Sequence, residues 1–172
     1  MKKGRDLRCS SGVGLISKRW PRESAIWKRY GRRRVEGVMY LFDTDIIANI
    51  FKKQPSPGLI AKLAKTPLRA QHISTITISE IVYGAWKSSQ PRRHLENLEK
   101  ILLPTVTILG FDSKAAYVCG RLRARLEQEG KPLALADLEI AAIAIAHDLV
   151  LVSGNTGHFS RIPGLALENW LE

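Results

Sequence analysis

The stretch Met39-Tyr40-Leu41-Phe42-Asp43-Thr44-Asp45-Ile46-Ile47 decides how this chain folds. Its first four residues form a short apolar run of the kind found in a buried β-strand. An aspartate closes the run, and the residues from 45 to 51 have a helical pattern. A carboxylate directly after a buried strand costs free energy unless it is paired, protonated or bound to a metal. The stretch therefore predicts a strand, an acidic turn and a helix, in that order.

From residue 39 onward, short apolar strands alternate with amphipathic helices. Strands are predicted at 40–42, 71–74, 104–109, 149–153 and 165–167, and helices at 45–51, 59–65, 91–103, 113–128 and 135–147. One more helix is predicted to begin at a Thr77 cap, because apolar residues at 78, 81, 82 and 85 form a helical stripe. This alternation argues for an α/β fold with a parallel sheet covered by helices.

Two further acidic residues lie within apolar segments. Glu80 occurs in the segment 78–84 and Asp137 in the segment 135–142, and both segments have few basic residues that could pair with a carboxylate. Ligands of parallel sheets bind beyond the carboxyl ends of the strands. Asp43 ends the first strand, Asn155 follows the strand at 149–153, and Glu80 and Asp137 come early in helices. The sequence thus predicts that these four side chains share one edge of the sheet.

Each of the four residues also has a purely structural explanation. Asp43 could be the N-cap of the next helix, and Glu80 lies off the apolar stripe, as a solvated helix residue would. Asp137 could be a cap, although its helical neighbours are apolar, and Asn155 favours turns. Gly84, one turn after Glu80, would leave space over that carboxylate.

Three nearby residues are expected to matter less. Asp45 and Glu139 are neighbours of stronger candidates and are interpreted as secondary. His158 is predicted to form hydrogen bonds in a loop rather than to bind a metal.

Taken together, the acids favour a hard divalent cation. Three or four oxygen ligands without nearby cysteine or histidine ligands suit Mg²⁺ or Mn²⁺. Such a site is typical of phosphodiester hydrolysis, in which the metal lowers the pKa of a bound water and stabilises the leaving oxygen.

The net charge of +11 is distributed unevenly over the 172 residues. Residues 1–38 hold 12 of the 27 Lys and Arg residues and three acids, so their net charge is +9, and residues 39–172 carry only +2. Residues 1–38 therefore form a basic extension, interpreted as disordered or as the product of a misplaced start codon. We favour Met39 as the natural first residue, because a complete strand pattern begins there. A nucleic-acid-binding arm and a transit-like peptide are the alternatives.

The remaining composition points to a cytoplasmic protein with reduced thiols. Cys9 and Cys119 are far apart, and no Cys/His cluster suggests zinc. Cys119 fits a helix core position. No apolar run is long enough to span a membrane, and residues 1–38 lack the apolar stretch of a secretory signal.

Four ordered blocks resemble the motifs of PIN-domain ribonucleases, and most closely those of VapC toxins from VapBC toxin–antitoxin pairs. The resemblance covers Met39 to Glu172 almost end to end and excludes residues 1–38. Its blocks are Phe42–Ile47, Ile78–Gly84, Ala136–Ala142 and Leu151–Leu165.

This resemblance implies a Mg²⁺- or Mn²⁺-dependent endoribonuclease with a three-layer α/β/α sandwich around a parallel sheet. The family's acids correspond to Asp43, Glu80 and Asp137, which would be the metal ligands and catalytic residues. The fourth acidic position is occupied by Asn155, which brings no charge and weakens the case for a second metal. Thr44 and Ser153 match hydroxyl positions that support the site.

The resemblance also implies partners. VapC proteins usually form homodimers and are inhibited by a VapB antitoxin that places a basic or aromatic side chain in the acidic pocket. Their substrates are structured RNAs, in several members tRNA. Contacts with RNA would use basic residues around the acidic centre: Lys52, Lys53, Lys87, Arg92, Arg93 and Arg161, each of which is also an ordinary surface charge.

Two other functions stay open at this point. Phe42–Asp45 also resembles the nucleophile motif of haloacid-dehalogenase-type phosphatases, with Asp43 as nucleophile. However, Ile46-Ile47 does not fit that motif, and no later acid pair is present. The third alternative is a catalytically inactive PIN-like module that binds RNA or protein, which the loss of the fourth acid would permit.

Overall fold

The computed structural model describes residues 37–172, which lie in one compact unit. The expectations for the basic extension therefore fall outside the described residues, apart from 37 and 38. The strands are β1 (Tyr40–Phe42), β2 (Gln71–Ser74), β3 (Thr107–Leu109), β4 (Val150–Val152) and β5 (Ala166–Glu168). The α-helices are α2 (Thr44–Ile50), α3 (Pro57–Lys65), α4 (Thr75–Lys87), α5 (Pro91–Asn97), α6 (Ser113–Gln128), α7 (Leu135–Ala146) and α8 (Thr156–Phe159).

The five strands form one parallel sheet in the order β3-β2-β1-β4-β5. The chain runs outward from β1 through β2 to β3, and then crosses to the other side of β1 to form β4 and β5. Between β1 and β4 the order of the strands therefore reverses, which is where open parallel sheets bind their ligands. Leu41 is paired with Leu151 and Phe42 with Val152, so both strands end level at this point.

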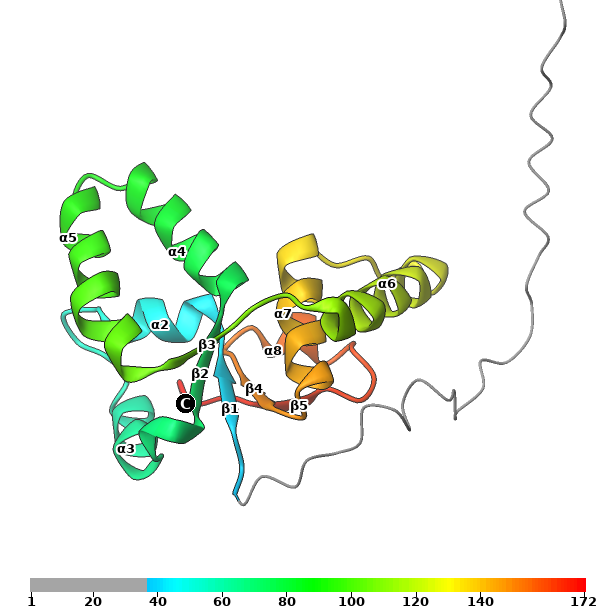
Figure 1. Ribbon diagram of the computed structural model, residues 1–172, viewed down its shortest axis with the longest axis horizontal. Helices are drawn as coiled ribbons and strands as arrows, with labels where there is room; N and C mark the ends of the chain where they lie inside the picture. Colours follow the sequence, from blue (N-terminus) through cyan, green and yellow to red (C-terminus); the bar gives the residue numbers. More distant parts are fainter. Residues whose placement is uncertain (1–36) are drawn as a thin grey trace, which may run out of the picture. The chain divides into compact units, whose positions relative to one another are not determined.

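Helices cover both faces of the sheet, giving the expected three-layer α/β/α sandwich (Figure 1). Side chains alternate between the faces of a strand. Leu41 and Leu151 pack with the apolar faces of α6 and α7. Phe42 and Val152 point the other way, into a second core that includes residues of α2 and α3. The central strands β1 and β4 thus contribute to cores on both faces of the sheet, as in other parallel sheets.

The helix after β2 begins earlier than the sequence predicted. Ser74, not Thr77, is its N-cap, and the Ser74 Oγ accepts a hydrogen bond from the Thr77 backbone N–H at 2.8 Å. The Thr77 hydroxyl bonds to the same oxygen at 2.8 Å. Both residues have the hydroxyl expected of a cap, and the position of the strand end decides in favour of Ser74.

The predicted helix at 91–103 and strand at 104–109 also have different boundaries. Helix α5 ends at Asn97 and is followed by a π-helical turn, Leu98–Leu102, and a 3₁₀ turn, Leu103–Thr105. Pro104 has no N–H to donate and cannot continue a regular α-helix. Strand β3 therefore begins only at Thr107.

Within residues 37–172 there is no helix long and apolar enough to cross a membrane. Cys119 is buried in α6, as predicted from its position on the helix.

Candidate active site

Asp43 lies at the sheet's switch point and is buried, with 6% of its surface exposed. Its Oδ1 accepts a hydrogen bond from the Thr44 backbone N–H at 2.7 Å, so Asp43 is the N-cap of α2. The Ser153 hydroxyl donates to its Oδ2 at 2.7 Å. The structural explanation and the site assignment are therefore compatible, because the helix cap holds the carboxylate at the edge where a ligand would bind.

Burial is the main reason why the pKa of Asp43 is raised to about 6. The hydrogen bonds from Ser153 and Thr44 lower this pKa, and the neighbouring negative charges of Asp45 and Asp137 raise it. Ionisation of Asp43 is therefore unfavourable for two reasons: the carboxylate is buried, and the neighbouring carboxylates of Asp45 and Asp137 are also negative. A cation at this position would relieve both effects.

Asp137 projects from the first turn of α7, which brings a second carboxylate close enough to influence Asp43. Its Oδ2 lies 3.3 Å from Nδ1 of His158. The same ring nitrogen is 2.9 Å from the side-chain amide nitrogen of Asn155. A proton on Nδ1 would be donated to Asp137, and without that proton Nδ1 would accept from Asn155. His158 therefore connects two predicted site residues; it forms hydrogen bonds as predicted, but from the short helix α8 rather than from a loop.

Asn155 is joined to Asp43 through Ser153. The Asn155 backbone N–H donates to the Ser153 Oγ at 3.0 Å, and the Ser153 hydroxyl donates in turn to Asp43. Ser153 is completely buried. The hydroxyl position noted in the sequence is thus the link between the end of β4 and the acidic centre.

Glu80 reaches the site through Thr44. It lies on α4, partly buried, and its Oε2 accepts a short hydrogen bond from the Thr44 hydroxyl. Because Thr44 directly follows Asp43, this bond ties α4 to the start of α2. The side chain is therefore held at the edge of the acidic centre.

Asp45 has a larger role than the sequence suggested. Its Oδ2 accepts from the Gly154 backbone N–H at 2.8 Å, which fixes the turn between Ser153 and Asn155. Burial raises the pKa of Asp45, and Oδ1 has no hydrogen-bond partner among the described residues. A Cβ at position 154 would lie 2.8 Å from Asp45 Oδ2 and 2.6 Å from Leu171 Cδ1, so glycine suits this close approach. The signal in the sequence was a second acid two residues after Asp43, followed far along the chain by a glycine turn.

The donor set suits Mg²⁺ or Mn²⁺ better than a cation that needs an all-protein cage. Within residues 37–172, no three His, Cys, Asp or Glu side chains are placed to hold an ion together. Mg²⁺ usually takes one or two carboxylates and completes its shell with waters and phosphate oxygens. Asp43 and Asp137 would provide such a pair.

A carboxylate site at the switch point of a five-stranded parallel α/β/α sheet is the arrangement expected of a PIN domain. The PIN-domain family model matches residues 40–165. The ribonuclease VapC2 of Haemophilus influenzae is 34% identical over 134 residues, which cover 78% of this chain and 99% of that protein. The tRNA(fMet)-specific endonuclease VapC of Shigella flexneri is 33% identical, with 77% and 98% covered.

A solved structure gives the same result. The VapBC2 crystal structure from Rickettsia felis, bound to a promoter DNA fragment, contains a chain with 35% identity and a TM-score of 0.70. The match covers 77% of this chain and 99% of that one. The chain therefore belongs to the PIN-domain family, and its relatives there include VapC ribonucleases.

Proposed function

We propose that this protein is a Mg²⁺- or Mn²⁺-dependent endoribonuclease, the toxin of a toxin–antitoxin pair. The observation that carries the proposal is the buried Asp43 carboxylate, with its pKa near 6 and Asp137 close by, at the switch point of a PIN fold. Because the chain belongs to the PIN-domain family, we no longer consider the haloacid-dehalogenase-type phosphatase alternative. An inactive binding module would be distinguished from a nuclease by the cleavage of total tRNA.

Four side chains have proposed roles in cleavage. Asp43 and Asp137 would hold the cation, and Glu80 would orient the attacking water or accept its proton. Asn155 would position the site through its amide without adding charge. When bound, the cation supplies a water of lowered pKa and a positive charge for the leaving oxygen. Ser153 and Thr44 keep Asp43 and Glu80 in place through their hydroxyl groups.

The substrate and partners are proposed from the relatives. The Shigella flexneri relative is specific for tRNA(fMet), so tRNA is the RNA substrate to test first. The Rickettsia felis relative was solved as a VapBC2 complex, and we propose a VapB-type antitoxin, a homodimer and a cytoplasmic location for this protein.

The test is cleavage of total tRNA by the antitoxin-free protein in the presence of Mg²⁺ or Mn²⁺. We expect discrete fragments that disappear with EDTA and in the Asp43→Asn variant. Folded, metal-binding protein that leaves tRNA and other cellular RNA intact would favour the inactive binding module instead.

Metal binding should also be visible without any substrate. A ligand that binds only the folded protein stabilises it by about 2.7 kcal/mol at a concentration of 100 Kd. We expect saturating Mn²⁺ to raise the melting temperature of the wild type by several degrees and to have little effect on Asp43→Asn/Asp137→Asn. Equal shifts in both proteins would show that the cation binds elsewhere.

We also propose that the working protein begins at Met39, with residues 1–38 outside it. The family model begins at residue 40, which supports this boundary. Intact mass and N-terminal peptide analysis of the protein from its native source should find Met39 as the first residue. Peptides from residues 1–38 would refute the proposal.

A further inference from the structure

Helix α4 carries an open stripe of side chains that begins at the candidate active site. Residues three, four and seven positions apart lie on one side of a helix, so Glu80 is followed on its own side by Tyr83, Gly84 and Lys87. We call these four residues the α4 track. Glu80 and Lys87 are about 10 Å apart along the helix axis, roughly the rise of three stacked nucleotides.

The track is unobstructed at its centre. A Cβ added to Gly84 would meet nothing within 4 Å. The space that the sequence suggested beside Glu80 is therefore present. Glycine in the middle of a helix costs about 1 kcal/mol relative to alanine, and neither a positive φ nor a close contact explains this one. Because Gly84 has no side chain, nothing projects from the helix surface between Glu80 and Lys87 at this position.

Two large aromatic side chains are exposed on this helix. Tyr83 is 65% exposed and Trp86 is 69% exposed. The Lys87 ammonium lies 5.1 Å from the centre of the Tyr83 ring and donates a hydrogen bond to the Tyr83 hydroxyl at 3.3 Å. An exposed ring beside a cation is the combination that single-stranded nucleic acid uses, with a base on the ring and a phosphate on the charge.

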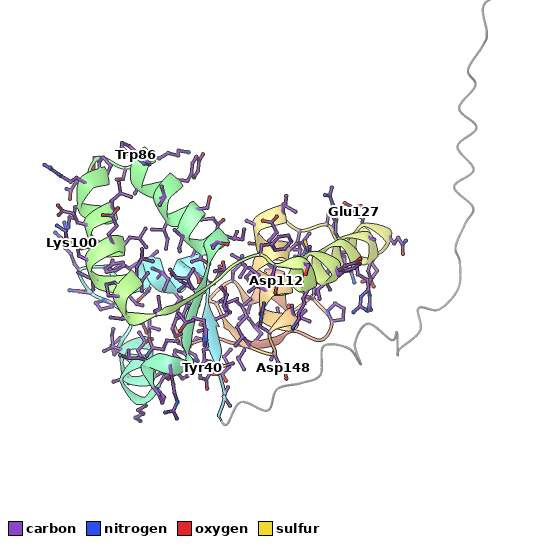
Figure 2. The ribbon with its side chains drawn as sticks, in the orientation of Figure 1. Tyr40, Trp86, Lys100, Asp112, Glu127 and Asp148 are labelled. Atoms are coloured by element: carbon purple, nitrogen blue, oxygen red, sulfur yellow. The ribbon has the colours of Figure 1, made fainter. Side chains whose placement is uncertain are left out.

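More positive charge continues the track at the end of the hairpin formed by α4 and α5. Arg92 and Arg93 lie in the first turn of α5, and both are exposed. Figure 2 shows Trp86 at the end of α4 where the chain turns towards α5. The surface thus changes from acidic at Glu80, where a cation would bind, to aromatic and basic at the hairpin end.

We propose that the α4 track binds a single-stranded segment of the RNA substrate next to the scissile phosphate. Tyr83 stacks on a base, and Lys87, with Arg92 and Arg93 beyond it, neutralises the following phosphates. The proposal rests on the proposed ribonuclease function. Exposed aromatic residues also occur in protein interfaces, but the basic residues and the open connection to Glu80 favour a polyanion that must reach the active site.

Gly84 allows a test that leaves the packing of the protein unchanged. Gly84→Gln adds a neutral side chain, Gly84→Glu adds a negative one of the same size, and Gly84→Lys adds a positive one. Affinity for a short single-stranded RNA is measured by fluorescence anisotropy in the Asp43→Asn background, where no cleavage interferes. We expect Gly84→Glu to weaken binding about tenfold relative to Gly84→Gln, and Gly84→Lys to strengthen it.

A second pair of variants tests the aromatic contact. Tyr83→Ala should weaken binding about tenfold, whereas Tyr83→Phe keeps the ring and should stay within about threefold of the parent. In the Asp43-containing protein, the same substitutions should raise KM and leave kcat nearly unchanged.

Unchanged RNA affinity in both Gly84→Glu and Tyr83→Ala would overturn the proposal. If light scattering also showed a changed molar mass for these variants, the surface would be assigned to a second copy of the chain. Binding without cleavage by any wild-type preparation would instead refute the ribonuclease function while preserving the track, so the two failures are distinguishable.

Discussion

Asp43→Asn is expected to lower the cleavage rate by about a thousandfold, the scale on which removal of one preorganised electrostatic contact acts. The substitution removes a ligand charge but little volume. The asparagine Oδ1 can still accept from the Thr44 N–H, and its amide still faces Ser153. The loss should therefore appear in kcat without unfolding of the protein. A variant that retains wild-type activity would defeat the assignment of Asp43.

The same variant should be more stable than the wild type when both are free of metal at neutral pH. The pKa of Asp43 is raised from 3.8 to about 6 in the folded protein, mainly by burial. Between these values the folded state holds more protons than the unfolded state, so the contribution of Asp43 to stability decreases as the pH rises through this window. A difference of about two pKa units corresponds to about 3 kcal/mol.

Urea unfolding at several pH values can measure this effect. With EDTA present, the difference in unfolding free energy between Asp43→Asn and the wild type should grow from pH 4 to pH 7 and then level off. Other titrating groups largely cancel in this difference, because the two proteins share them. A constant difference across the range would show that burial does not perturb the Asp43 carboxyl.

The sequence predicted a parallel sheet covered by helices, and it placed four candidate site residues at one edge of that sheet, because both predictions depend on short-range patterns; the catalytic roles of these residues stay a prediction. Apolar runs of strand length and helical stripes set the layers, and carboxylates at the ends of those runs indicated the site. The comparisons support the family, and the structure brings Asp43 and Asp137 together. The wrong helix start at Thr77 arose because Ser74 and Thr77 are equally good caps locally.

The contacts between distant segments could not be predicted in the same way. Asp45 accepts from Gly154, which lies 109 positions further on, and His158 reaches Asp137 across 21 positions. Neither pairing leaves a periodic signal, since the first depends on how β1 and β4 become neighbours and the second on how α7 and α8 lie relative to each other. The C-terminal residues are a similar case, because no strand or helix pattern marks Trp170.

Trp170→Ala is expected to destabilise the protein by about 3–5 kcal/mol, the cost of removing a large buried aromatic side chain. Trp170 is only 2% exposed and packs edge-on against Tyr40 and Phe42, with ring centres 4.8 and 5.4 Å away. Its indole N–H donates to Glu168 at 2.7 Å. This one side chain thus fastens the end of the chain to β1, the strand that delivers Asp43.

The loss should extend to the turn beside the active site. Leu171 lies next to Gly154, and its carbonyl accepts a hydrogen bond from the Ser56 hydroxyl at 3.3 Å. Because Leu171 directly follows Trp170, loss of the Trp170 packing should weaken both of these contacts. Trp170→Phe is the matched control, since it keeps a ring against Tyr40 and Phe42 and should cost about 1–2 kcal/mol. Urea midpoints with unchanged m-values would report these differences. A cost below 1 kcal/mol for alanine would mean that the C-terminal residues do not hold β1 in place.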